Sequence, residues 1–156
     1  MHGGALRVTA ALDAGEPVRE GARALLAEEE RQGLAAPATW LAFGAGIGRK
    51  IEIVRETMGR LARQGRIWGY GAAGKATLWV NAAGMGYLEA VVDASPLRAG
   101  RLMPGTHTPI VPPEALRERP PDYVFVTAWN YAELIRSKEA WYPGIWVTPL
   151  PELRFS

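Results

Sequence analysis

The sequence predicts an α/β fold: a small Rossmann-like parallel sheet of about five strands, flanked by helices and preceded by an N-terminal pair of helices. From residue 66 onward, strand-like and helix-like segments alternate, which is typical of a parallel sheet covered on both faces. The segment Gly69-Tyr70-Gly71-Ala72-Ala73-Gly74-Lys75, called here the glycine turn, follows the apolar run Arg66-Ile67-Trp68 and opens a helix. This G-x-G-x-x-G pattern lets the backbone turn sharply off a strand and approach a ligand closely.

The N-terminal part predicts one strand and two helices. Residues 2–9 have the pattern of a short strand with no hairpin partner nearby. Apolar residues at helical spacing predict helices over 18–32 and from 37 or 38 to 64, and Gly33 and Gly65 end them.

The alternating part predicts the sheet itself. Strands are expected at 66–70, 88–93, 109–111, 123–126 and 145–148, and helices at 74–84, 113–117 and 130–140. Three regions follow: a strand and linker at 1–17, the helical pair at 18–65, and the Rossmann-like domain at 66–156.

Composition excludes several classes of protein. Cysteine is absent, which excludes disulfides and a cysteine-based zinc site and leaves the cytoplasm as the expected location. The 18 basic and 16 acidic residues are scattered, so no basic patch predicts nucleic-acid binding. No window reaches the ~18 continuous apolar residues of a membrane helix. We therefore expect neither nucleic acid nor membrane as a partner.

A parallel sheet of this kind binds ligands at the carboxyl ends of its strands, where the strand order reverses. The polar segments 69–75, 93–107 and 127–133 are expected there. Lys75, in the first turn of its helix, either meets a phosphate or is an exposed helix lysine. Asp93, at a strand end, either accepts hydrogen bonds from sugar hydroxyls or caps the turn through Ser95.

The loop after Asp93 combines arginines, glycines and a histidine. Arg98 and Arg101 either recognise phosphate through their forked donors or stay solvated and unpaired. His107 is expected to make a structural hydrogen bond, because no nucleophile and no second histidine accompany it as partners for general-base chemistry.

Trp129 and Asn130 follow the fourth predicted strand. Asn130 is expected to be the N-cap of the next helix. The large ring of Trp129 favours core packing, and the alternative is a flat face offered to a base or sugar.

Catalytic patterns are missing. The chain has no G-x-S-x-G elbow and no H-E-x-x-H pattern, and the glycine turn lacks the spacing of a Walker loop. We predict no catalytic residue, no metal ligand and no cofactor in this chain, and a binding site in preference to a reaction centre.

Several segments together resemble the C-terminal domain of the S-adenosylmethionine-dependent C-methyltransferases that act on nucleotide-linked deoxysugars. The glycine turn, Val91-Val92-Asp93, the run from Gly100 to Ile110, the run from Arg119 to Val124, and Trp129-Asn130 match in order and spacing. The run from Gly100 to Ile110 is the most specific of them. The resemblance covers essentially the whole chain.

The resemblance implies a domain that holds the nucleotide-sugar. Zinc and S-adenosylmethionine would belong to upstream domains, and residues 2–8 resemble the closing strand of the methyl-donor domain. The domain alone would then be inactive, with the methyl-donor domain as its partner in the full-length protein. The implied substrate-binding residues are Gly69, Tyr70, Gly71, Ala72, Ala73, Lys75, Asp93, Arg98, Arg101, Thr106, His107, Trp129 and Asn130.

Three departures from the family pattern stand out: Gly74-Lys75-Ala76 where the family usually has Ala then Lys-Gly, Leu97-Arg98 where it has a lysine after Asn-Pro or Ser-Pro, and Ala128 in place of a proline. They bear on which sugar is bound more than on the fold. Two other hypotheses stay open on the sequence: a stand-alone NAD(P)-type dinucleotide-binding module, supported by the glycine turn with Asp93, and an interaction remnant that binds nothing.

Overall fold

The computed structural model describes residues 5–10, 12 and 17–156, and the chain divides into two units, Met1–Arg49 and Lys50–Ser156. The first unit holds α1 (Glu20–Arg31) and the start of α2 (Pro37–Leu61). Gly33 adopts a φ of 67°, and the Thr39 hydroxyl donates to its carbonyl oxygen at 2.8 Å. The glycine stop between the two predicted helices is confirmed.

The predicted strand at 2–9 does not form in its described part. Residues 5–9 have no strand assignment, and residues 2–4 lie outside the described residues. A strand needs a neighbour to satisfy its backbone groups, and no described strand pairs with this segment.

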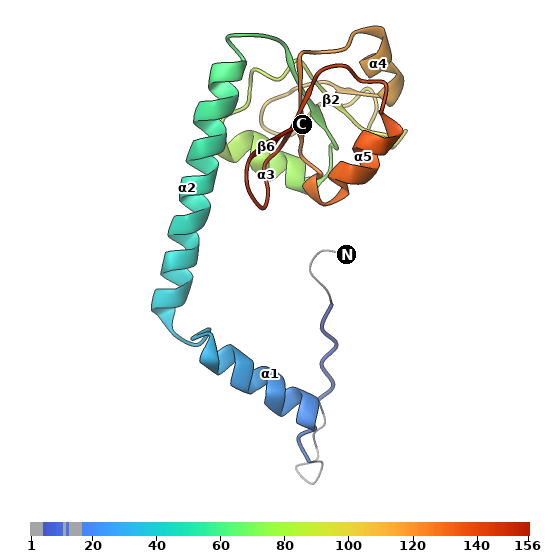
Figure 1. Cartoon of the computed structure of the whole chain (residues 1–156). Coiled ribbons are helices and arrows are strands. Elements are labelled where there is room, and N and C mark those ends of the chain that lie inside the picture. Colours follow the sequence, from blue (N-terminus) through green and yellow to red (C-terminus); the bar gives the residue numbers. More distant parts are fainter. Residues whose placement is uncertain (1–4, 11, 13–16) are drawn as a thin grey trace. The chain divides into compact units, whose positions relative to one another are not determined.

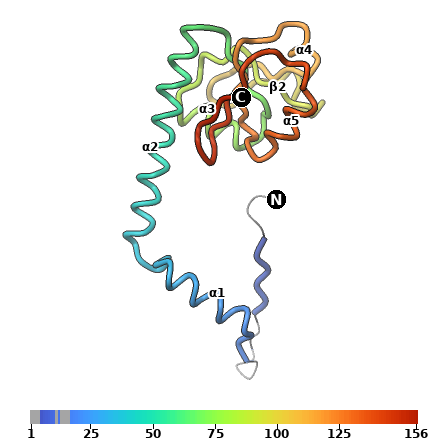
Figure 2. The backbone as a smooth tube through the Cα atoms, in the orientation of Figure 1, coloured from blue at the N-terminus to red at the C-terminus, as the bar shows by residue number. Residues whose placement is uncertain are grey.

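The second unit alternates between strand and helix, as predicted (Figure 1), and Figure 2 traces the path of its backbone. Its strands are β1 (Ile67–Tyr70), β2 (Ala90–Val92), β3 (Ile110–Val111), β4 (Tyr123–Val126), β5 (Ile145–Thr148) and β6 (Arg154–Phe155). Its helices are α3 (Gly74–Ala82), α4 (Pro113–Glu118), the 3-10 turn η1 (Trp129–Tyr131) and α5 (Ala132–Lys138), together with the second half of α2.

The sheet has the order β3-β2-β1-β4-β5-β6, and its first five strands are parallel. The five predicted parallel strands and the α/β class are confirmed. The sequence missed β6, which pairs antiparallel with β5. With two residues and prolines at 149 and 151 ahead of it, this strand has no alternating pattern to detect.

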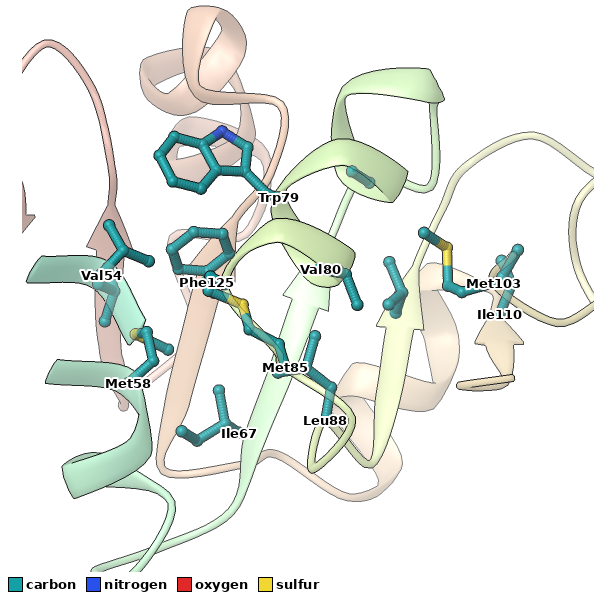
Figure 3. Packing of buried hydrophobic residues seen from close by; sticks show 14 residues of the cluster. Val54, Met58, Ile67, Trp79, Val80, Met85, Leu88, Met103, Ile110 and Phe125 are labelled. Carbon is teal, nitrogen blue, oxygen red and sulfur yellow. The ribbon is translucent and has the colours of Figure 1, made fainter. Parts of the chain in front are cut away.

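The two faces of the sheet bury separate clusters. On one face, Val54 and Met58 of α2 and Trp79 and Val80 of α3 pack against strand residues such as Phe125 (Figure 3). The boundary between the units falls inside α2, upstream of the 65/66 boundary that the sequence suggests, because this helix contributes to the core.

On the opposite face, Leu116 of α4 and Ile135 of α5 pack against Trp68, Val124 and Trp146. Helices therefore cover both faces, so β1, β2 and β4 can be apolar along their whole length. Among the described residues, no helix combines the length and apolar character needed to cross a membrane.

Candidate functional site

The strand order reverses beside β1. From β1 the chain passes through α3 to β2 on one side, and from β4 it passes through α5 to β5 on the other. The glycine turn after β1 and the segment 127–131 after β4 therefore meet at the same edge of the sheet. This is the topological switch point at which such sheets bind ligands.

Gly71 fixes the path of the glycine turn. Its φ is 100°, and its N–H donates to the Val92 carbonyl oxygen at 2.7 Å. A Cβ at this position would lie 2.8 Å from the Ala128 Cβ. Buried Thr127 completes the junction, since its hydroxyl donates to the carbonyl oxygens of Tyr70, at 2.7 Å, and of Gly71. Only glycine fits this crossing of the two loops.

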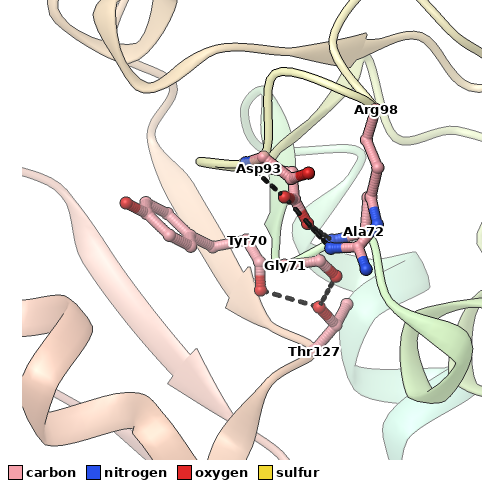
Figure 4. A network of polar contacts seen from close by, with 7 residues as sticks. Tyr70, Gly71, Ala72, Asp93, Arg98 and Thr127 are labelled. Carbon is pink, nitrogen blue, oxygen red and sulfur yellow. Dashed lines mark hydrogen bonds and ion pairs between the residues drawn. The ribbon is translucent and has the colours of Figure 1, made fainter.

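The Asp93 side chain accepts a hydrogen bond from Ala72, the residue of the glycine turn that follows Gly71 (Figure 4). Its Oδ2 accepts the N–H of Ala72 at 2.6 Å, and its Oδ1 accepts the N–H of Ser95 at 2.8 Å. Arg98 Nη1 lies 3.1 Å from Oδ2 and 3.2 Å from Oδ1. The predicted cap through Ser95 is confirmed. Asp93 is buried, with only 7% of the residue exposed, and the carboxylate is paired with donors of this chain.

Lys75 links the glycine turn to the β4 loop. Its Nζ donates to Asn130 Oδ1 at 3.0 Å and lies 4.9 Å from the centre of the Trp129 ring. Lys75 is half-buried, so it is not the fully exposed helix lysine of the second alternative. As a cation in the first turn of α3, it stands beside backbone N–H groups that have no acceptor within the helix.

Asn130 is not the predicted N-cap. It lies inside η1, and α5 begins at Ala132 after a Tyr131 that makes no side-chain cap. The amide is instead positioned by Lys75. Trp129 packs edge-on against Trp79 at 6.3 Å between ring centres, which confirms its predicted contact with the core.

Gly69 and Tyr70, the first two residues of the glycine turn, are the last two residues of strand β1. A Cβ on Gly69 would lie 3.1 Å from Val91 Cγ2. The Tyr70 phenol leaves the switch point for the α5-facing side of the sheet, where it donates to Glu139 Oε1 at 2.9 Å. Burial, reinforced by this hydrogen bond to a carboxylate, raises the pKa of Tyr70 above its ordinary value.

Stability is expected to fall above about pH 10, the ordinary pKa of a phenol. The pKa values of Tyr70 and Tyr142 are both raised, chiefly by burial. Below the unfolded pKa both states hold the phenolic protons, whereas above it only the unfolded state loses them and is favoured. As the pH rises from about 8 to 11, the urea midpoint of the unmodified chain should fall, and it should fall less steeply in Y70F and Y142F. Equal slopes in these variants and in Y131F, at an exposed tyrosine, would contradict this assignment.

The loop after Asp93 folds back on itself. Met103 and Thr108 are buried, the N–H of Met103 donates to Thr108 at 2.8 Å, and the hydroxyls of Thr106 and Thr108 lie 2.9 Å apart. Asn81 of α3 anchors this loop by donating to the Pro104 carbonyl oxygen at 3.0 Å.

His107 adopts a φ of 56° and donates its backbone N–H to Met103. Its imidazole makes no hydrogen bond to any described residue, so the predicted structural hydrogen bond of the His107 side chain does not form. The side chain is exposed, as is that of Arg101. No hydrogen bond or ion pair between described residues joins Thr106, His107 or the Arg101 side chain to the glycine turn.

Sequence reasoning missed two positioning residues, Thr127 and Asn81. Thr127 is a polar residue directly after an apolar strand, and that position could have identified it. Asn81 lies within a predicted helix, and nothing in the surrounding sequence indicates that it contacts the loop. In the described part of the chain, no group of three His, Cys, Asp or Glu side chains could hold a metal ion.

Comparison with known proteins gives two findings. A family model described as C-methyltransferase C-terminal domain matches residues 1–151. The C-methyltransferase NovU of Streptomyces niveus is 34% identical over 161 aligned residues, which cover 99% of this chain and 38% of NovU. The chain thus spans well under half the length of this relative.

Proposed function

The chain belongs to the family of C-methyltransferase C-terminal domains, and on this premise we propose that it binds the nucleotide-linked deoxysugar of an S-adenosylmethionine-dependent C-methyltransferase. The observation that carries the proposal is the contact that Lys75, the last residue of the glycine turn, makes with Asn130 and Trp129 at the switch point. A cation beside helix-terminal amides suits phosphate oxygens, while an amide and an indole edge suit a sugar or base.

The chemistry of methyl transfer is assigned to another part of the enzyme. The described residues contain no metal cluster, and the cysteine-free sequence does not fit the zinc site that the resemblance implies for upstream domains. We assign zinc and S-adenosylmethionine to a methyl-donor domain, the proposed partner of this one. On this proposal the domain alone binds substrate in the cytoplasm but transfers no methyl group.

Calorimetry with dTDP and a dTDP-sugar tests this function. We expect saturable heat with a Kd between about 1 μM and 1 mM. K75Q should weaken binding about tenfold, because it removes a charge-assisted contact to phosphate. K138Q, the same change at an exposed position at the end of α5, should leave the affinity unchanged. No heat and no melting shift with either ligand would contradict the proposal.

The dinucleotide-binding hypothesis is not favoured. In such proteins the acid after the second strand contacts a ribose hydroxyl. Here both carboxylate oxygens of Asp93 already accept donors from Ala72, Ser95 and Arg98. Titration with NADH should therefore give no saturable response.

A further inference from the structure

A pocket of about 420 Å³ opens on the β4–β5 side of the switch point. It lies between the segment from η1 to α5 and the residues that lead into β6. Trp129, Asn130 and Tyr131 line one part of it, and Leu150 and Pro151 another. Its volume falls within the range of small-molecule sites in proteins, about 300–1,000 Å³.

Two arginines line this pocket, Arg136 of α5 and Arg154 of β6. Arg136 Nη1 donates to Ser156 Oγ at 3.1 Å. Ser156 and Arg154 are two residues apart at the end of an extended segment, so their side chains leave the same face of the sheet. Both guanidinium groups therefore belong to the side of the sheet that α5 covers.

The guanidinium groups of Arg136 and Arg154 have N–H donors that make no ion pair with a described carboxylate. Among the described residues no carboxylate lies within ion-pair distance of either one. A guanidinium carries five N–H donors, and the recorded bond from Arg136 to Ser156 uses one of them. Thr148, directly opposite Arg154 in the β5–β6 pair, has a buried hydroxyl without a hydrogen-bond partner in the described structure.

The other side of the switch point is poorly suited to a diphosphate. Asp93 is buried there, its carboxylate occupies the Ala72 N–H, and Arg98 is already paired with it. A diphosphate on that side would be repelled by the Asp93 carboxylate, and the Ala72 N–H could not donate to it because it already donates to Asp93. Lys75 donates to Asn130, which also lines the pocket, so the charge of Lys75 lies on the β4–β5 side.

We propose that Arg136 and Arg154 bind the diphosphate of the nucleotide-linked substrate in this pocket. The inference rests on the proposed function and names the residues that recognise its anionic group. Forked guanidinium donors match phosphate oxygens, and the ring of Trp129 borders the same space. Glu133 also lines the pocket, and its charge opposes binding.

Titration with inorganic pyrophosphate and with dTDP tests the pocket. R136Q and R154Q should each lower the affinity for both ligands about tenfold or more. E133Q should raise it severalfold. R63Q is the matched control, because Arg63 is an exposed arginine before β1, at the opposite end of the strands. It should bind like the unmodified chain, and melting temperatures should show that all four variants are folded.

The outcomes separate the two proposals. If the unmodified chain binds dTDP and both arginine variants, folded, bind it equally well, the pocket assignment is wrong while the proposed function stands. If pyrophosphate binding depends on both arginines and nucleotide-sugar binding is absent, the pocket stands and the substrate assignment falls. If neither ligand binds to the unmodified chain, both proposals are contradicted.

Discussion

Replacing Gly71 by alanine is expected to destabilise the second unit by about 2–5 kcal/mol. The backbone at Gly71 has a φ of 100°, a conformation that costs a residue with a Cβ roughly 1–3 kcal/mol. The new methyl group would also lie 2.8 Å from the Ala128 Cβ and 3.2 Å from the Thr127 hydroxyl. Neither neighbour is a flexible side chain that can move aside.

Gly74→Ala is the matched control. Gly74 begins α3, a Cβ there would meet nothing within 4 Å, and its φ is not positive. Because alanine favours the helix by up to about 1 kcal/mol over glycine, G74A should be neutral or stabilising. Urea unfolding followed by tryptophan fluorescence measures both variants. Equal stability losses in G71A and G74A would contradict the geometry of the turn.

Replacing Asp93 by alanine is expected to cost about 2–3 kcal/mol. The change removes the acceptor for the N–H groups of Ala72 and Ser95 and leaves Arg98 without its carboxylate. Water can reach Arg98, whose side chain is 45% exposed, so the loss should stay below that of a fully buried ion pair.

Two further variants separate the contributions at Asp93. D93N keeps one acceptor oxygen, but its NH₂ group cannot accept a hydrogen bond from the remaining N–H donors. It should therefore lose about half as much stability as D93A. D122A removes an exposed aspartate that accepts the backbone N–H of Arg66 at 2.7 Å, and it should cost about 1 kcal/mol or less. If D93A unfolds at the same urea concentration as D122A, then burial of the Asp93 network does not stabilise the turn.

Much of the fold could be predicted from the sequence because its strands are buried on both faces. A continuous apolar run such as Tyr123–Val126 between prolines and a polar loop has few other interpretations, and its bounds agree with β4. The glycine turn was recognisable for a related reason, since a positive φ at Gly71 requires glycine.

The remaining features depend on contacts between residues far apart in the chain. The two-residue strand β6 forms only because β5 offers an edge, and Asn130 makes its contact with Lys75 across 55 positions. Local capping preferences favoured Asn130 as an N-cap, but the tertiary contact prevailed. Likewise Arg136 and Arg154 come together through the sheet, and nothing in their local sequence predicts a shared pocket.

The central claim, that a nucleotide-sugar binds at the switch point, is tested most directly by following backbone and indole N–H resonances of the ¹⁵N-labelled chain during titration with dTDP-sugar. The structure predicts saturable shifts concentrated at residues 71–75, at Asn130 and at the Trp129 indole, with the N–H resonances of α1 unchanged. Saturation of binding with no shift in these two segments, or with shifts confined to other surfaces, would contradict the claim.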